Sequence, residues 1–150
     1  MIADISKKLY EILTQDATLQ GLLPSVNDES NVLEMRSPKP AEDGVFPVVV
    51  YRVRFGTLNT SVRSLDVMEW SVEIDIIDNN TSMATVWSIH ERIYALLHNR
   101  NLSDENGIAY QCENEYIDTA YDSTTLTNFI LTRYKIISRE KTKTTIGDLS

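Results

Sequence analysis

The sequence is poor in the residues that build the common chemical sites of proteins. It contains one cysteine and two histidines, and its five glycines are scattered along 150 residues. One cysteine cannot form an intrachain disulfide. There is no Cys-x-x-Cys pair, no His-Glu-x-x-His motif and no glycine-rich phosphate loop. The sequence therefore predicts no metal site, no cofactor and no redox centre.

Long apolar runs are missing as well. No stretch approaches the roughly 20 apolar residues that a membrane-spanning helix needs, so we expect no membrane partner. The first residues lack a basic segment followed by an apolar core, so a secretion signal is not predicted.

Basic residues are scarce and unevenly placed. There are 14 Lys and Arg against 22 Asp and Glu, which gives a net charge of −8. A primary nucleic-acid ligand is therefore disfavoured, because phosphate binding needs a basic surface. Five basic residues fall within the last eighteen positions of an otherwise acidic chain: Arg133, Lys135, Arg139, Lys141 and Lys143.

The clearest pattern in the chain runs from residue 66 to residue 98. Apolar side chains alternate with polar ones from Met68 to Ile76, as in a half-buried strand. They then recur every three or four positions from Met83 to Leu97, as in an amphipathic helix. Asn80 or Thr81 is expected to cap this helix. The direct succession predicts that the helix folds back onto the apolar face of the strand.

The remaining elements surround this unit. An apolar stripe predicts a helix over the first fifteen residues, and Asp16 is a suitable N-cap for a short helical turn after it. Strands are expected over 46–55, 108–121 and 126–138, with a short strand near 32–35. A change of alternation predicts a bulge near Asn114. Trp70 and Trp87 are most simply core residues.

This order predicts an α+β fold. We expect a mostly antiparallel β-sheet of about four main strands, with the N-terminal helix and the central helix packed on one face. Residues 1–138 would form the single domain, and residues 139–150 a flexible tail with too little apolar surface to fold alone.

Two segments are the candidates for partner contacts. The connection over 56–65 is about ten residues long, whereas a tight hairpin needs two to five. Before it, Arg52 and Arg54 can face Glu69, Ser71 and Glu73 across an antiparallel strand pair. The predicted interaction residues lie near this connection and in the tail: Arg54, Leu58, Val62, Arg63, Leu65, Arg139, Lys141 and Lys143.

No catalytic constellation stands out. His90 lies beside Glu91, but a lone His–Glu pair does not bind a metal, and His98 is eight residues away. We expect both histidines to be partly exposed helix residues. Cys112 is expected to be a buried or half-buried strand thiol.

Four segments of the chain follow one another in a characteristic order. The opening helix leads into Leu-x-x-Asp-x-x-Leu-x-x-Leu-Leu at 13–23, and Phe-Pro-Val-Val-Val-Tyr follows at 46–51. The strand at 70–76 leads into a helix ending Ile-Tyr-Ala-Leu-Leu, and a late strand reads Arg-Tyr-Lys-Ile at 133–136. In this order and spacing, the segments resemble the tail-terminator or tail-completion proteins of tailed bacteriophages and related prophage elements. The resemblance spans roughly residues 5–138. The family's last strand usually ends the domain, so residues 139–150 depart from its pattern.

The resemblance implies a non-enzymatic virion protein of the tail or neck, assembled in the host cytoplasm. Such proteins form a ring, usually a hexamer, that caps the head-proximal end of the tail tube and stops its growth. The ring then docks to the connector, or head-completion protein, of the head. An acidic lumen would let DNA pass without adhesion.

Two alternatives remain open from the sequence. One is another neck or head-completion protein, which would share the size, the acidity and the lack of chemistry. The other is a small intracellular enzyme that uses Glu69, Glu73, Asp75 or Cys112. That enzyme would need these groups in a concave pocket with shifted pKa values.

Overall fold

The computed structural model describes residues 2–26, 29–34, 45–59, 67–102 and 108–140. Its helices are α1 (Ile2–Gln15), α2 (Ala17–Leu22) and α3 (Ala84–Leu97). The four long strands are β4 (Val48–Asn59), β5 (Val67–Asp78), β7 (Ile108–Asp122) and β8 (Thr127–Glu140). The short strands are β1 (Ser25–Val26), β2 (Glu29–Ser30), β3 (Val32–Glu34) and β6 (Arg100–Asn101).

The main sheet is larger and more mixed than the sequence predicted. Its order is β3-β4-β5-β8-β7-β6, and β1 and β2 form a separate two-stranded ladder. The four long strands are antiparallel to their long neighbours, but β3 pairs in parallel with β4. The α+β class is confirmed, and the prediction of about four antiparallel strands is corrected to six strands with one parallel pair. Strand β3 is the short strand expected near 32–35, whereas the two-residue strand β6 was not predicted.

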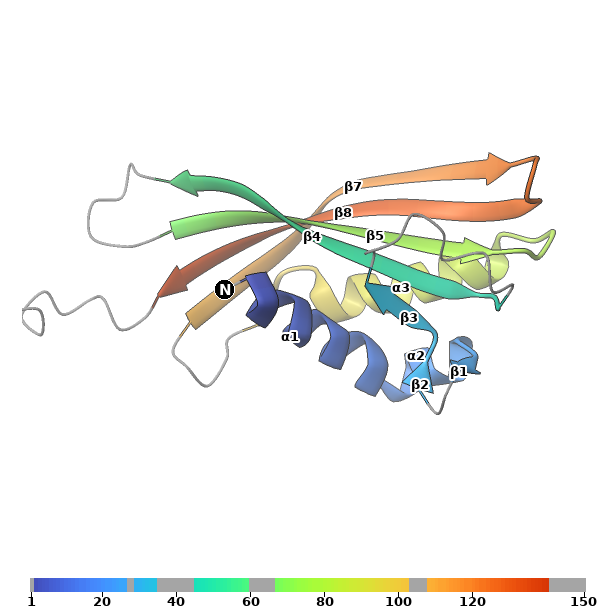
Figure 1. The fold of residues 1–150 in the computed structure, drawn as a ribbon, viewed down its shortest axis with the longest axis horizontal. Helices are drawn as coiled ribbons and strands as arrows, with labels where there is room; N and C mark the ends of the chain where they lie inside the picture. The colour runs from blue at the N-terminus through green and yellow to red at the C-terminus, as the bar shows by residue number, and fades with distance from the viewer. Residues whose placement is uncertain (1, 27–28, 35–44, 60–66, 103–107, 141–150) are drawn as a thin grey trace, which may run out of the picture.

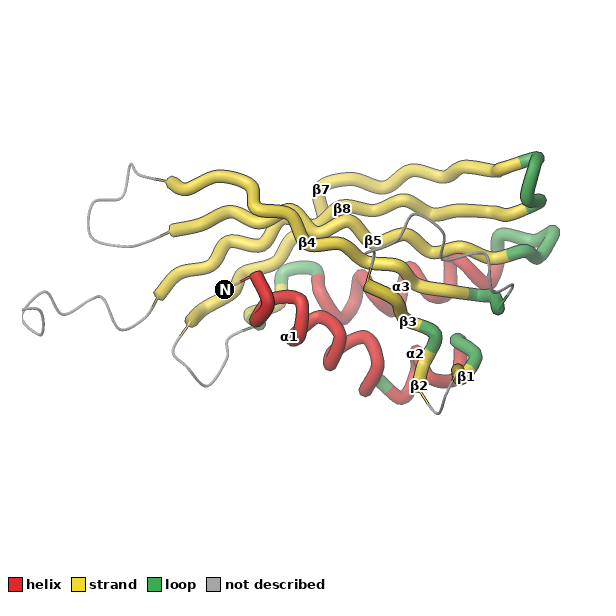
Figure 2. The backbone as a smooth tube through the Cα atoms, in the orientation of Figure 1, coloured by secondary structure: helices red, strands yellow, loops and turns green. Residues whose placement is uncertain are grey.

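The helices cover one face of a strongly twisted sheet. In Figure 1 the four long strands cross near their middle, so that their order from top to bottom is reversed between the two ends. Figure 2 shows α1 and α3 on the same side of this sheet, as predicted. We call the helix-covered face the inner face and the opposite one the outer face.

The larger of the two buried clusters lies between the inner face and these two helices. Trp70, Val72, Ile74 and Ile76 of β5 are buried in one cluster with residues of both helices. The helical members include Leu9 and Leu13 of α1, and Val86, Ile89, Ile93 and Leu97 of α3. The predicted packing of α3 onto the apolar face of β5 is therefore confirmed.

One of the two predicted helix caps is confirmed and the other is wrong. Asp16 caps α2, and its carboxylate accepts a hydrogen bond from the Leu19 amide at 3.0 Å. Helix α3 starts at Ala84, and neither Asn80 nor Thr81 is its N-cap. The Asn80 side chain accepts instead from the Ser82 amide at 3.3 Å, and the Ser82 hydroxyl accepts from the Ala84 amide at 3.1 Å. Side-chain oxygens of the polar turn before α3 thus satisfy two of the backbone amides there.

The late hairpin matches the prediction closely. The register of β7 against β8 shifts between Asn114 and Tyr116, where a bulge was expected. Asp122 then accepts hydrogen bonds from the Thr124 and Thr125 amides and closes the turn.

Two strands end later in the chain than predicted. Strand β8 continues to Glu140, two residues past the predicted domain limit, and β4 continues to Asn59, into the predicted connection. The rest of that connection, 60–66, and residues 141–150 lie outside the described residues, so the flexible tail stays a prediction.

Candidate interaction surface

Because β3 and β6 are short, two stretches of sheet edge have no described strand beside them. Strand β3 pairs with β4 only at 49–51, and β6 pairs with β7 only at 111–112. His98 accepts from the Asn114 amide and occupies the next position of the β7 edge. Among the described residues, no strand lies beside the free edge of β4 over 52–59 or beside the free edge of β7 over 115–122. The C-terminal ends of β4 and β7 lie at opposite ends of the sheet, on the side away from the helices (Figure 1). Such edges are where a further strand can add.

The β4 edge carries only positive charge. Arg52 and Arg54 are exposed, and β4 contains no acidic residue. Both arginines lie on the outer face, because Arg52 pairs with Glu73 and Arg54 with Ser71 in the β5 register. The Arg54 Nε lies 3.6 Å from Glu73 Oε1, so the expected cross-strand pairing is confirmed.

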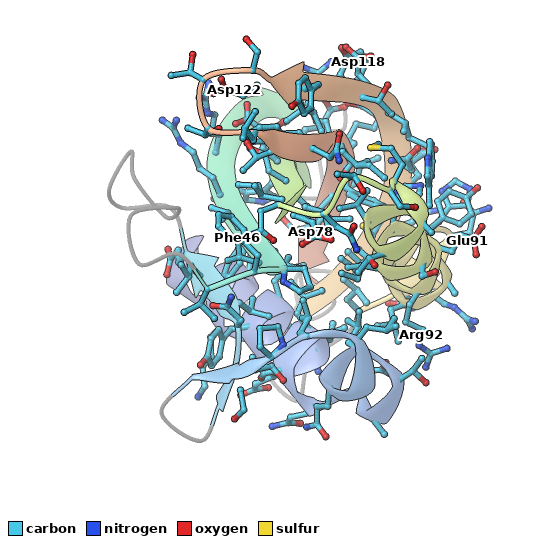
Figure 3. The ribbon with its side chains drawn as sticks, turned by 90° about the vertical axis from the view of Figure 1, so that its right-hand side faces the viewer. Phe46, Asp78, Glu91, Arg92, Asp118 and Asp122 are labelled. Atoms are coloured by element: carbon cyan, nitrogen blue, oxygen red, sulfur yellow. The ribbon has the colours of Figure 1, made fainter. Side chains whose placement is uncertain are left out.

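The β7 edge carries only negative charge. Its acidic residues are Glu113, Glu115, Asp118 and Asp122, and the strand has no lysine or arginine. Asp118 and Asp122 mark this edge at the top of Figure 3. Glu115 lies 3.7 Å from Arg133 and 3.9 Å from Lys135 of β8, so both basic residues are already engaged within the chain. The two free edges of one sheet therefore have opposite charge.

Exposed apolar side chains accompany the β7 edge. Ile117 and Tyr121, on the inner side of β7, are 42% and 60% exposed. On α3, Trp87 and Tyr94 are also exposed, and the Tyr94 ring stacks on His98 at 4.4 Å between centroids.

Two sequence predictions about α3 are wrong. Trp87 is not a core residue, because the buried stripe uses Val86, Ile89 and Ile93 and leaves position 87 at its side. His90 is buried rather than partly exposed, and no described residue forms a hydrogen bond with its Nδ1. Burial lowers the pKa of His90, which keeps the imidazole neutral at physiological pH.

The groups proposed for the enzyme alternative are divided between the two faces of the sheet. Glu69, Glu73 and Asp75 lie on the outer face of β5, whereas Cys112 lies on the inner face, in register with Ile136 and Trp70. Cys112 is fully buried as predicted, and burial raises the pKa of its thiol to about 12. A thiol with this pKa is protonated at neutral pH and is a poor nucleophile. Within the described ranges, no group of three His, Cys, Asp or Glu residues could hold a metal ion.

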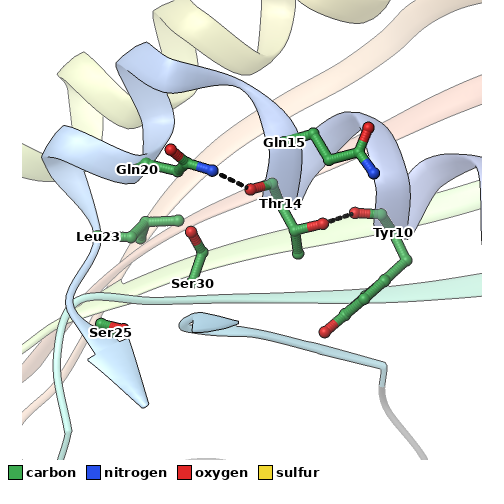
Figure 4. A pocket seen from close by; sticks show the side chains of 7 residues that line it. All are labelled: Tyr10, Thr14, Gln15, Gln20, Leu23, Ser25 and Ser30. Atoms are coloured by element: carbon green, nitrogen blue, oxygen red, sulfur yellow. Dashed lines mark hydrogen bonds between the residues drawn. The ribbon is translucent and has the colours of Figure 1, made fainter. Parts of the chain in front are cut away.

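A cavity of about 490 Å³ lies elsewhere, between the end of α1, α2 and the β1–β2 ladder (Figure 4). Its lining is made of hydroxyl, amide and apolar groups without charge: Tyr10, Thr14, Gln15, Gln20, Leu23, Ser25 and Ser30. Two of its polar groups are bound within the chain, since Thr14 donates to the Tyr10 carbonyl and Gln20 to the Thr14 carbonyl. Among these described residues there is no carboxylate, imidazole, amine or thiol that could activate a hydroxyl.

Few of the predicted interaction residues can be placed. Arg54 is an exposed residue of the β4 edge. Leu58 lies in β4 and Arg139 in β8, but only their backbone is described. The other predicted positions lie outside the described residues: Val62, Arg63, Leu65, Lys141 and Lys143.

The sequence prediction missed the acidic edge of β7. The four acidic residues of 108–122, without a basic one, were visible in the sequence. Their meaning depends on the edge position of β7, which only the strand order reveals.

Comparison with known proteins finds a solved structure with a similar fold. No protein-family model matches this sequence, and no curated protein is significantly similar to it. No helix in the described part of the chain is long and apolar enough to cross a membrane. Among solved structures, the chain is similar to a chain from the "Virion of native gene transfer agent (GTA) particle", with a TM-score of 0.63 and 14% sequence identity. The alignment covers 93% of this chain and 94% of that one, so the two share one fold over nearly their whole length.

Proposed function

We propose that this chain is a structural protein of a phage-like particle that closes the head-proximal end of the tail tube. The observation that carries this proposal is the shared fold with a chain from a gene transfer agent virion, over 93% of the residues. The resemblance of the sequence to tail terminators supplies the more specific role. The oppositely charged sheet edges, which no described strand covers, support it, because an assembly protein needs surfaces that join copies.

In the proposed role, about six copies form a ring on the last turn of the tail tube. A closed ring of head-to-tail contacts leaves no free face of the kind that adds further tube subunits, so growth stops. The partners are other copies of this chain, the tail-tube protein and the head-completion, or connector, protein. DNA would only pass through the lumen, where the net charge of −8 discourages adhesion.

The proposal is tested by mixing the purified protein with tail tubes of the same particle. We expect electron microscopy to show extra density at one end of each tube, and we expect tube elongation to stop when the protein is added during polymerisation. Tubes incubated with buffer alone are the control.

Two outcomes would contradict the terminator role. If the protein bound purified connectors but left tube ends bare and growing, it would be another neck protein. Binding along the whole length of the tube would show that it does not recognise the end.

A further inference from the structure

We infer that neighbouring copies of this chain join edge to edge, so that the free edge of β4 in one copy pairs with the free edge of β7 in the next. This inference rests on the proposed ring and names the contact that would build it. The free stretches, 52–59 of β4 and 115–122 of β7, are of similar length, and no described strand covers either.

The strand directions are compatible with this contact. Strands β4, β5, β8 and β7 are successive neighbours and each pair is antiparallel, so β4 and β7 run in opposite directions. A head-to-tail repeat of the sheet therefore brings β7 and β4 of adjacent copies together as an antiparallel pair. Both free stretches are the C-terminal halves of their strands, so the two copies are offset along the strand direction. Strands that close into a barrel or ring need such a stagger.

Charge favours this pairing over the alternatives. Asp118 is opposite Leu131 of β8, which is opposite Asp75 of β5 and then Val50 of β4. This register places Asp118 on the outer face, together with Arg52 and Arg54. A continuous sheet would thus set the β4 arginines beside the β7 carboxylates. A two-fold contact between two β7 edges would instead oppose acid to acid, and one between two β4 edges would oppose base to base.

Apolar surface supports the same contact on the inner face. Ile117 and Tyr121 project from the inner side of β7 and are 42% and 60% exposed in the single chain. Val53 lies on the inner face of β4, where it pairs with the buried Val72. A neighbouring β4 would place its Val53 beside the β7 apolar side chains and cover part of their surface.

The test uses two charge-reversed variants and their mixture. Arg52→Glu with Arg54→Glu makes the β4 edge acidic, and Asp118→Lys with Ala120→Lys puts two basic side chains at neighbouring positions on the outer face of the β7 edge. We expect the wild type to have about six times the 17.1 kDa chain mass by light scattering, and we expect each variant alone to have the mass of one chain. An equimolar mixture should recover the wild-type mass, because each variant then meets the complementary edge of the other.

Controls separate assembly from folding. Lys7→Glu changes the same kind of charge on an exposed position of α1 and should leave the mass unchanged. Circular dichroism should show that both edge variants are folded. The inference is overturned if either edge variant keeps the wild-type mass, if the mixture stays monomeric, or if the wild type stays monomeric at the highest soluble concentration.

The outcomes also separate this contact from the proposed function. Rings that depend on the two edges but do not bind tube ends would refute the terminator role and leave the contact standing. Edge variants that still cap tubes would refute the contact and leave the terminator role standing.

Discussion

Two carboxylates on β5 show how neighbours decide the behaviour of a single residue. Glu73 and Asp75 are two positions apart on the same outer face. Across the adjacent strands Glu73 faces Arg52 and Arg133, whereas Asp75 faces Val50 and Leu131. Asp75 is therefore desolvated without a cationic partner, and burial, with a smaller contribution from Glu73, raises its pKa to about 6.

We predict that Asp75→Asn stabilises the protein at neutral pH. The folded state binds a proton at Asp75 below about pH 6, whereas the unfolded chain binds one only below about pH 4. The free energy of unfolding from this group therefore falls as the pH rises from about 4 to about 6. Because Asp75 is partly exposed, the asparagine should add only about 1–2 kcal/mol at pH 7. Urea unfolding at pH 4 and pH 7 measures the difference.

The matched control for Asp75 is Glu73→Gln. Glutamine at position 73 removes a carboxylate that faces two arginines, so it should not stabilise the protein at pH 7. The explanation is rejected if Asp75→Asn and the wild type have the same pH dependence of unfolding.

At the scale of elements, one carboxylate joins two helices. Asp16 caps α2 through the Leu19 amide and also accepts two hydrogen bonds from Arg92 of α3, at 2.9 Å from Nε and 2.6 Å from Nη2. The Arg92 guanidinium holds the pKa of Asp16 below its usual range. Arg92 and its neighbour Glu91 lie on the α3 side of Figure 3. The cap was predictable from sequence spacing, but the link to position 92 was not.

We predict that Asp16→Ala lowers the free energy of unfolding by about 2–3 kcal/mol at pH 7, because it removes both a cap and a paired charge. The pKa of Asp16 is depressed in the folded state, so its contribution is present above about pH 4. The contribution is lost as the pH falls through the folded pKa. The difference between wild type and variant should therefore shrink in acid, which thermal unfolding at pH 7 and below pH 4 can measure.

Glu91→Ala is the control for this link, because Glu91 is an exposed neighbour on the same helix. An equal loss of stability in both variants would contradict a specific role for Asp16.

At the scale of the whole molecule, the predicted contacts with the tail tube or connector lie partly beyond the last described strand, whereas the folded core does not. The described core lies within residues 2–140, and β8 ends at Glu140. We predict that a chain ending at Glu140 keeps its melting temperature within about 2 °C, since surface changes away from the core usually cost little. Binding to tail tubes or connectors should weaken, because Lys141 and Lys143 are predicted partner contacts. Calorimetry and a pull-down assay give the two readouts.

The control for the truncation is a full-length chain with Lys141→Ala and Lys143→Ala. It should weaken binding to a similar extent if charge is the cause. A large fall in melting temperature after truncation would show instead that residues beyond 140 belong to the folded core.

The sequence by itself determined the long elements and the side of each that is buried. Period-two and period-3.6 patterns are local, so Trp70 to Ile76 and Val86 to Leu97 specify their buried faces without knowledge of the fold. Asp16 and the bulge near Asn114 were predictable for the same reason. Only the tertiary structure decided strand order, which depends on contacts between residues far apart in the chain. That order places β4 and β7 at opposite edges of one sheet. The inferred contact between copies, in which the β4 arginines meet the β7 carboxylates, depends on this placement.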